Sequence, residues 1–152
     1  MLTTSPPHES WILCLELRVV VESITPRNVL TQGTKVASGL NQIGQTVATL
    51  TQQITQAGYT PFSDDDAGLI VDTLTTFVEV HQALLNTIIG KHGILESTPF
   101  TAPIAFALRA LESIVDSFAY ALIGLIPTRA DAAQAQLNAL SVTFTRAIDT
   151  YS

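Results

Sequence analysis

Three long segments with a regular apolar stripe follow Pro61, and each begins with residues that favour a helix N-terminus. Proline or glycine separates the segments, so each predicted helix has a defined end. Apolar residues that recur every three or four positions give a helix one hydrophobic face, which must be buried against another element. The pattern therefore predicts helices stacked around an apolar interior.

The composition indicates one domain with an uncharged polar surface. A chain of 152 residues is long enough to bury a core. Hydrophobic residues make up 47% of it and charged residues only 13%, whereas roughly 25% of a typical soluble domain is charged. The net charge of -6 argues against nucleic acid and anionic membranes as partners, because both require clustered Lys or Arg.

Residues 1–24 form an atypical N-terminal segment. The apolar run around Trp11 is interrupted by Glu16 and Arg18, so it does not approach the ~20 residues of a membrane-spanning helix. It is also a poor secretory signal, because no Lys or Arg precedes the apolar core and no small-x-small cleavage pattern follows it. Two interpretations stay open: a degraded or misassigned signal region, and a short packed helix or strand. We expect residues 25–152 to form the helical domain.

The first two predicted helices are delimited by local signals. Thr25 and Pro26 predict the first start, and residues 58–61 its end. Three glycines inside it predict a bend or two shorter helices. Ser63 and three aspartates predict the second start, and Gly93 a left-handed cap after it. The first stripe comprises Leu40, Ile43, Val47, Leu50 and Ile54. The second comprises Ile70, Leu74, Phe77, His81, Leu84 and Ile88, flanked by Val71, Val78, Leu85 and Ile89.

Two further helices complete the predicted domain. The third starts at residues 101–103 and stops at Pro127, and a capping-box-like pair, Thr128 and Asp131, starts the fourth. Short loops predict that sequential helices run antiparallel. The predicted fold class is therefore all-α, an antiparallel up-down bundle of four or five helices. The third core face comprises Ile104, Leu108, Leu111, Val115, Phe118, Leu122 and Ile126. The fourth comprises Ala133, Leu137, Leu140, Phe144, Ala147, Ile148 and Tyr151.

Four segments carry a family resemblance. They are FSDDDAGLIVDTLTTFVEVHQALLN (62–86), TPFTAPI (98–104), LIGLIPT (122–128) and AIDTY (147–151). Together they resemble the fungal hydrophobic surface binding protein A family, also called cell wall galactomannoprotein, over roughly residues 25–152. The resemblance implies a small helical protein, secreted or in the cell wall, that adsorbs to hydrophobic surfaces, assists lipolytic enzymes there, and in some branches binds fatty acids inside the bundle. Extracellular placement follows from the resemblance alone, since residues 1–24 lack a clean signal peptide.

The bundle interior is one candidate site. Side chains of the last three helices are placed to enclose an apolar cavity, a usual location for ligands in helical bundles. A solid core made of the same residues is the alternative. For a bound fatty acid, His81 would donate a hydrogen bond to the carboxylate, or Gln and Thr side chains at the bundle ends would. The cavity candidates are Phe77, His81, Leu84, Leu85, Leu111, Val115, Phe118 and Phe144.

Phe106 and Tyr120 form the other candidate site. They lie opposite the core face of the third helix, fourteen residues apart, and share a stripe about 21 Å long. One interpretation is that another helix covers them, such as residues 11–21. The other is that they form an exposed patch for adsorption to wax, polyester or lipid aggregates.

The sequence offers little for catalysis. No Gly-x-Ser-x-Gly elbow, His-Glu-x-x-His motif or phosphate loop occurs, and the three histidines stand in separate local settings. Cys14 is interpreted as a structural thiol. The acidic run 64–66 does not match a calcium loop, because Gly68 falls one position early. We therefore expect a protein that is not an enzyme, with no cofactor and no metal site.

Three functions remain in view. The first is a secreted or cell-wall protein that binds hydrophobic surfaces or lipids and helps to recruit a lipolytic enzyme. The second is a fatty-acid carrier with an apolar cavity inside the bundle. The third is a structural or interaction bundle without a lipid ligand. The expected partners are hydrophobic surfaces, fatty acids or other lipids, with no nucleic acid and no transmembrane segment.

Overall fold

The computed structural model describes residues 5–56 and 62–152, with side chains described for residues 12–54 and 62–152. Within these ranges the chain forms helices and no strand, so the predicted all-α fold class is confirmed. The five long helices are α1 (Ser5–Glu22), α3 (Thr34–Gln56), α4 (Asp64–Gly90), α6 (Thr101–Leu125) and α7 (Ala130–Tyr151). The short elements are α2 (Val29–Gln32), α5 (His92–Leu95) and the 3-10 turn η1 (Pro127–Arg129).

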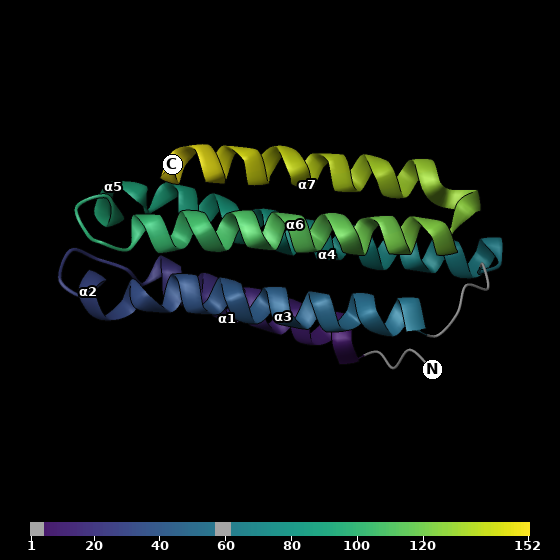
Figure 1. Cartoon of the computed structure of the whole chain (residues 1–152), viewed down its shortest axis with the longest axis horizontal. Coiled ribbons are helices and arrows are strands. Elements are labelled where there is room, and N and C mark those ends of the chain that lie inside the picture. Colours follow the sequence, from purple (N-terminus) through teal and green to yellow (C-terminus); the bar gives the residue numbers. More distant parts are fainter. Residues whose placement is uncertain (1–4, 57–61) are drawn as a thin grey trace.

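The long helices lie side by side (Figure 1), and their pairwise contacts close a ring. Helix α1 packs against α3 and α4, α3 packs against α6, and α7 packs against both α6 and α4. Consecutive long helices run in opposite directions, as predicted. The neighbours α3 and α6 therefore run in the same direction, and so do α4 and α7, because one long helix separates the members of each pair in the chain. This order leaves α4 and α6 on opposite sides of the interior.

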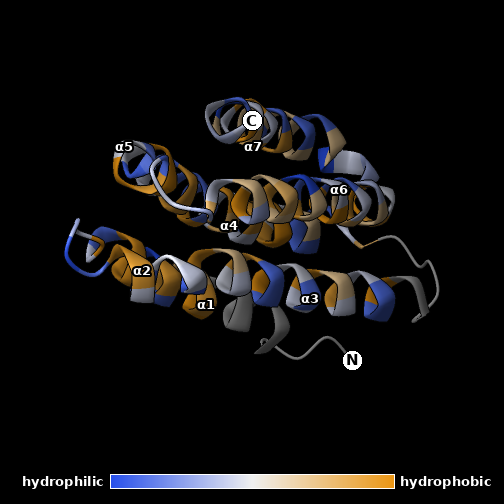
Figure 2. Cartoon of the chain, turned by 60° about the vertical axis from the view of Figure 1, so that its left-hand side comes forward, coloured by the Kyte–Doolittle hydropathy of each residue, from blue (hydrophilic) through white to orange (hydrophobic). Residues whose placement is uncertain are grey.

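The predicted apolar faces form the core. Every residue of the faces predicted for the first and third helices is buried, and so are six of the seven predicted for the fourth, Ile148 being half-buried. On α4 the stripe is buried from Leu74 to Ile88, whereas Ile70 is half-buried. In Figure 2 hydrophobic residues gather on the faces that the helices turn towards one another. The packing thus follows the helical periodicity of the sequence.

Of the starts predicted for the first two helices, one is confirmed and the other is wrong. Ser63 caps α4 as expected, with its side chain accepting a bond of 3.3 Å from the backbone N–H of Asp66. The start predicted at Thr25 and Pro26 is wrong, because the first helical residue of that region is Val29. The side-chain oxygen of Asn28 accepts a 2.7 Å bond from the backbone N–H of Thr25 instead, which stabilises a turn at this point.

Two other predicted signals are also wrong. Gly93 lies inside the short helix α5 and does not act as a left-handed cap. Thr128 does not form a capping box, because Pro127 opens the turn η1 and the N-cap of α7 is Arg129, with no side-chain capping bond. The hydroxyl of Thr128 bonds Asp64 instead. The hydrogen bond from Arg129, and after it this bond from Thr128, hold the pKa of the Asp64 carboxyl below its usual range. The terminator predicted at residues 58–61 lies outside the described residues.

Close packing of α1 on α3 depends on Gly39. A Cβ atom at this position would lie 2.6 Å from Cδ1 of Leu17, which is buried on α1. Gly39 lies inside an unbroken stretch of α3, so the helix does not bend at this residue. The absence of a side chain at Gly39 instead allows α1 to approach α3 closely. The predicted division of this region falls at Gly33, between α2 and α3.

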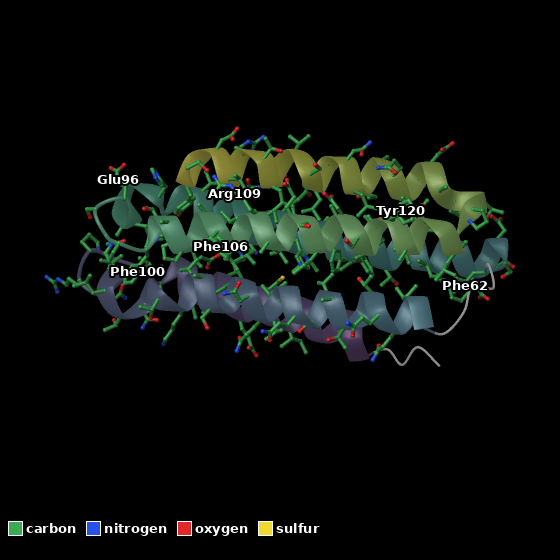
Figure 3. The ribbon with its side chains drawn as sticks, viewed as in Figure 1. Phe62, Glu96, Phe100, Phe106, Arg109 and Tyr120 are labelled. Atoms are coloured by element: carbon green, nitrogen blue, oxygen red, sulfur yellow. The ribbon has the colours of Figure 1, made fainter. Side chains whose placement is uncertain are left out.

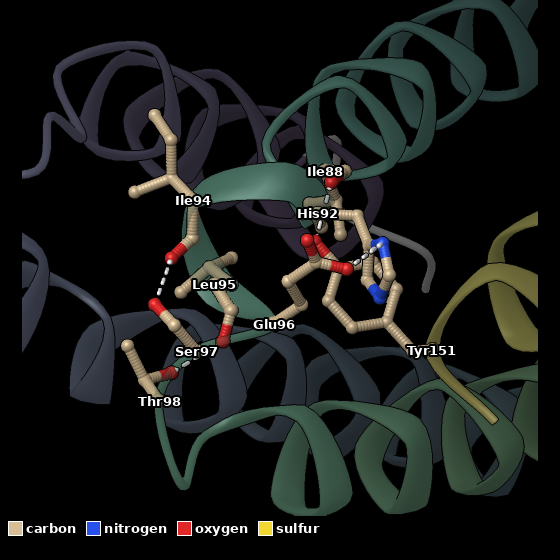
Figure 4. A network of polar contacts seen from close by, with 8 residues as sticks. All are labelled: Ile88, His92, Ile94, Leu95, Glu96, Ser97, Thr98 and Tyr151. Carbon is tan, nitrogen blue, oxygen red and sulfur yellow. Dashed lines mark hydrogen bonds and ion pairs between the residues drawn. The ribbon is translucent and has the colours of Figure 1, made fainter.

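The end of the bundle that carries α5 is closed by a polar network (Figure 4). The hydroxyl of Tyr151 donates a 2.5 Å bond to the backbone carbonyl of Ile88, and its ring meets His92 edge-on at a centroid distance of 4.9 Å. The hydroxyl of Thr98 donates a 2.6 Å bond to the backbone carbonyl of Leu95, whose side chain is buried. The bond of Tyr151 fastens the last turn of α7 to the end of α4, and the bond of Thr98 stabilises the turn that follows α5.

Candidate functional site

An apolar pocket lies between α3, α4 and α6 at the end of the bundle opposite α5, with a volume of about 190 Å³. Thr73 is its one polar lining residue within the described part of the chain. Figure 3 places Phe62 at this end, where α4 begins. The lining residues are Leu50, Ile54, Phe62, Leu69, Ile70, Thr73, Leu74, Phe77, Phe118, Leu122 and Leu125.

The arrangement of the helices explains the pocket. Its walls come from the last turns of α3 and α6 and the first turns of α4, three helices that converge here without α4 packing closely on α6. The backbone N–H of Phe62 donates a 2.8 Å bond to the carbonyl of Leu125, which holds the start of α4 beside the end of α6. Phe77 and Phe118 stand furthest from this end, and their ring centroids are 5.5 Å apart. These two rings form the inner limit of the pocket.

The structure brings two of the eight predicted cavity residues to this pocket, Phe77 and Phe118. The other six are buried but do not line it: His81, Leu84, Leu85, Leu111, Val115 and Phe144. The pocket lies nearer the start of α4 than most of the predicted cavity residues do, and α3 also contributes Leu50 and Ile54 to it. Both belong to the predicted stripe of the first helix, but periodicity alone does not show which end of a stripe borders a void.

His81 lies one turn beyond Phe77 and outside the pocket. Its ring stacks on that of Phe77 with centroids 4.0 Å apart. Nδ1 lies 2.7 Å from the backbone carbonyl of Phe77, and Nε2 lies 3.1 Å from the sulfur of Cys14. Because a carbonyl can only accept, Nδ1 carries the proton and the Cys14 thiol donates to Nε2. A ligand carboxylate could reach His81 only by displacing one of these bonds.

Burial keeps both partners neutral. It lowers the pKa of His81 to about 4, although the bond to the Phe77 carbonyl opposes the shift. Burial also raises the pKa of the Cys14 thiol well above its usual range. A neutral thiol is a poor nucleophile. The pair therefore joins α1 to α4 and has the features of a structural contact.

Phe106 and Tyr120 are exposed on α6, with 74% and 86% of their surfaces accessible (Figure 3). The interpretation that residues 11–21 cover them is wrong, because α1 packs on α3 and α4. Ser113 and Ser117, which lie between them along α6, are exposed too. The rings of Phe106 and Tyr120 are therefore separated by polar residues and do not form one continuous apolar patch on this face. Tyr120 also borders a groove between α6 and α7, whose lining includes the apolar residues Ile123 and Leu137 as well as Asp116 and Asn138.

The described residues contain no group of three or more His, Cys, Asp or Glu side chains placed to hold a metal ion. No single helix in these ranges combines the length and apolarity needed to cross a membrane. The pair formed by α6 and the segment Pro127–Tyr151 meets that criterion only jointly, with a bend of 109° between them.

Comparisons with known proteins identify the fold. No model of a known protein family and no curated protein matches the sequence. Among solved structures, AfMP4p in complex with palmitic acid has a TM-score of 0.88 at 19% identity, covering 97% of this chain and 96% of that one. Ligand-binding domain 1 of Penicillium marneffei MP1, complexed with arachidonic acids, has a TM-score of 0.74 at 10% identity and covers 97% and 94%.

Domain 2 of the same Penicillium marneffei protein, complexed with multiple arachidonic acids, has a TM-score of 0.73 at 14% identity and covers 100% of this chain and 97% of that one. The chain thus has an all-helical fold that is shared with structures solved as fatty-acid complexes. This likeness supports the resemblance to the hydrophobic surface binding protein A family noted in the sequence.

Proposed function

We propose that this protein binds long-chain lipids, with the acyl chain inserted between α3, α4 and α6. The observation that carries the proposal is the pocket itself, whose lining among the described residues is apolar apart from Thr73. Apolar pockets between the helices of a bundle are usual ligand sites. The fatty acids in the complexes of AfMP4p and MP1 support the same class of ligand for this fold.

The pocket admits part of a long chain in its present form. Its volume of about 190 Å³ lies between the ~150 Å³ of an engineered cavity that takes up benzene and the roughly 300 Å³ at the lower end of ligand pockets. Entry of further methylene groups requires Phe77 and Phe118 to separate, since their rings close the inner end. We therefore propose that the chain enters at the end near Phe62 and displaces this pair.

Displacement of a dansyl-labelled undecanoic acid by saturated fatty acids of increasing length tests the proposal. Each methylene group that enters an apolar site contributes about 0.8 kcal/mol, so affinity should rise about fourfold per added methylene and level off once the site is full. Absence of displacement at micromolar concentrations would remove the proposed function.

A matched pair of variants tests whether the acyl chain binds in this pocket. Ile70 and Ile89 are both half-buried isoleucines of α4 that pack against the core, but only Ile70 lines the pocket. Ile70→Trp should fill the pocket and weaken binding about tenfold or more, which corresponds to about 1.4 kcal/mol. Ile89→Trp should leave binding unchanged. Thermal unfolding of both variants shows that each is folded before their affinities are compared.

Adsorption to hydrophobic surfaces is a second candidate, favoured by the exposure of Phe106 and Tyr120. Replacing both with Ser should abolish retention on hydrophobic beads and leave stability within about 0.5 kcal/mol, because exposed side chains contribute little to folding. Unchanged retention would exclude these two residues as the adsorbing site. The acyl-chain assay is independent of this result, because neither residue lines the pocket.

The location that we propose for this protein rests on the family resemblance. We infer placement outside the cell or in the cell wall, where a lipid-binding protein could bring a lipolytic enzyme to its substrate. The test is the rate of hydrolysis of an emulsified ester by a lipase, with and without this protein. Recruitment predicts a higher rate only when the protein is present, and equal rates would contradict it.

A further inference from the structure

We propose that the pocket between α3, α4 and α6 prefers uncharged single-chain lipids, such as long-chain alcohols, to the anionic form of a fatty acid. This inference rests on the proposed function, because it concerns the polar head of a chain that is bound in the pocket. It follows from the charges around the pocket mouth, the end where α3 and α6 finish and α4 begins.

The walls of the pocket offer no cation to a carboxylate. Residues 36–90 contain neither Lys nor Arg, and they include all of α4 and all of α3 after Lys35. The basic residue of α6 is Arg109, nine positions before Phe118, and it donates a 2.5 Å bond to the hydroxyl of Ser152 at the far end of α7. Thr73 is left as the polar group of the described lining.

Arg129 is the basic side chain at this end of the described chain, and it is already engaged. Its Nε and Nη2 atoms donate to the two carboxylate oxygens of Asp64, at 3.0 and 3.3 Å. The guanidinium lies over Gly68, which does not line the pocket. A carboxylate at the mouth would have to compete with Asp64 for this group.

Negative charge surrounds the mouth instead. Asp65 and Asp66 are exposed in the first turn of α4 and make no close ion pair with a described residue, although the charge of Arg129 acts on Asp65 as well as on Asp64. Asp66 lies one turn before Ile70, on the helix face that lines the pocket. The C-terminal ends of α3 and α6, which carry negative partial charge, point to the same place. Asp131, at the start of α7, adds a further carboxylate at this end.

The positive N-terminal ends of α4 and α7, which both lie at this end, do not reverse this field. The first turn of α4 carries three aspartates, and Ser63 already accepts a bond from the N–H of Asp66. The first turn of α7 carries Asp131. An anionic head held at the mouth would therefore meet like charges, whereas a hydroxyl or ester group would not. The tail contributes the same apolar contacts in either case, so the head decides the preference.

Two probes of equal chain length test the inference: dodecanoate and 1-dodecanol, measured by probe displacement at neutral pH. We expect dodecanol to bind more tightly by a factor on the order of five, the effect of like charges about 4 Å apart in water. Raising the ionic strength should narrow the gap, because salt screens repulsion between exposed charges. A cation at the mouth would instead favour dodecanoate and make its binding weaker in salt.

Charge variants test whether the acidic residues at the pocket mouth cause the preference for dodecanol over dodecanoate. Asp65→Asn with Asp66→Asn should strengthen dodecanoate binding severalfold and leave dodecanol unchanged. Glu96→Gln with Asp149→Asn removes the same charge at the opposite end of the bundle and should change neither affinity. Tighter binding of dodecanoate in the unaltered protein, or equal responses to the two double variants, would overturn the inference while leaving the acyl-chain site intact. If neither probe binds, the proposed function itself fails.

Discussion

The thiol sulfur of Cys14 lies 3.1 Å from Nε2 of His81, so α1 is joined to α4 by a polar contact inside the core. Both groups are fully buried or nearly so, with exposures of 0% and 1%. The second ring nitrogen of His81 is bonded to the Phe77 carbonyl. This arrangement satisfies the imidazole without any charge.

Acid should destabilise the protein through His81. Burial lowers the pKa of its imidazole to about 4 in the folded state, from an ordinary value of 6.5. The unfolded chain therefore gains a proton in a range where the folded protein does not, so this contribution to stability is complete above pH 6.5 and is lost as the pH falls towards 4. The loss should total on the order of 3 kcal/mol, measured by denaturant unfolding at several pH values.

The variant His81→Leu provides the control for the acid effect. It should be less stable at neutral pH, because it leaves the Cys14 thiol without its acceptor. The gap between the two proteins should shrink between pH 6.5 and 4, since the variant has no imidazole to protonate. A gap that stays constant over this range would contradict the assigned pKa.

Cys14 should react slowly with thiol reagents in the folded protein. Its side chain has no exposed surface, and burial holds its pKa above the usual range, so the reactive thiolate is scarce. Labelling should require separation of α1 from the bundle or global unfolding. Reaction rates measured over a denaturant series give the free energy of that opening. Rapid labelling without denaturant would contradict the position of α1.

Gly39→Ala should destabilise the protein by about 1–3 kcal/mol, the usual effect of overpacking. The new methyl group would lie 2.6 Å from the Leu17 side chain, which is already buried. Adding Leu17→Ala should remove the clash, so the double variant should be more stable than the sum of the two single changes predicts. Denaturant unfolding of all four proteins measures this coupling. Additive effects would show that α1 does not pack as closely as the structure places it.

Tyr151→Phe should lower stability by about 1 kcal/mol, the net value of one hydrogen bond. The lost bond joins the Tyr151 hydroxyl to the carbonyl of Ile88. The effect should stay modest because that carbonyl also accepts a 3.1 Å bond from the backbone N–H of Lys91. Hydrogen exchange should show faster opening of the last turn of α7 in the variant. An unchanged exchange pattern would mean that the network in Figure 4 does not hold this end.

Much of the fold could be predicted because helix signals are local. The stripe around Leu40 and Ile43 is buried as expected, and Ser63 caps α4 through a bond within three residues. One capping prediction failed because a distant group competed for the same atoms: the hydroxyl of Thr128 bonds Asp64 and does not cap α7.

The candidate site depended more on tertiary structure. Phe77 and Phe118 could be selected from their stripes, but Leu50 and Ile54 could not be linked to them, because nothing in the chain indicates that α3 packs beside α6. The contact between Cys14 and His81 was also beyond sequence reasoning, since it joins an atypical N-terminal segment to the middle of α4.

The sequence by itself determined that this protein is an all-α bundle and which face of the four long helices after residue 25 is apolar, since both follow from spacing along a single helix. The order of the helices in the ring was decided only by the tertiary structure, and with it the position of the pocket and the exposure of Phe106 and Tyr120. The physical reason is that an apolar stripe specifies burial but not a partner. Which stripes meet, and where they leave a void, depends on how all five long helices fill one shared interior.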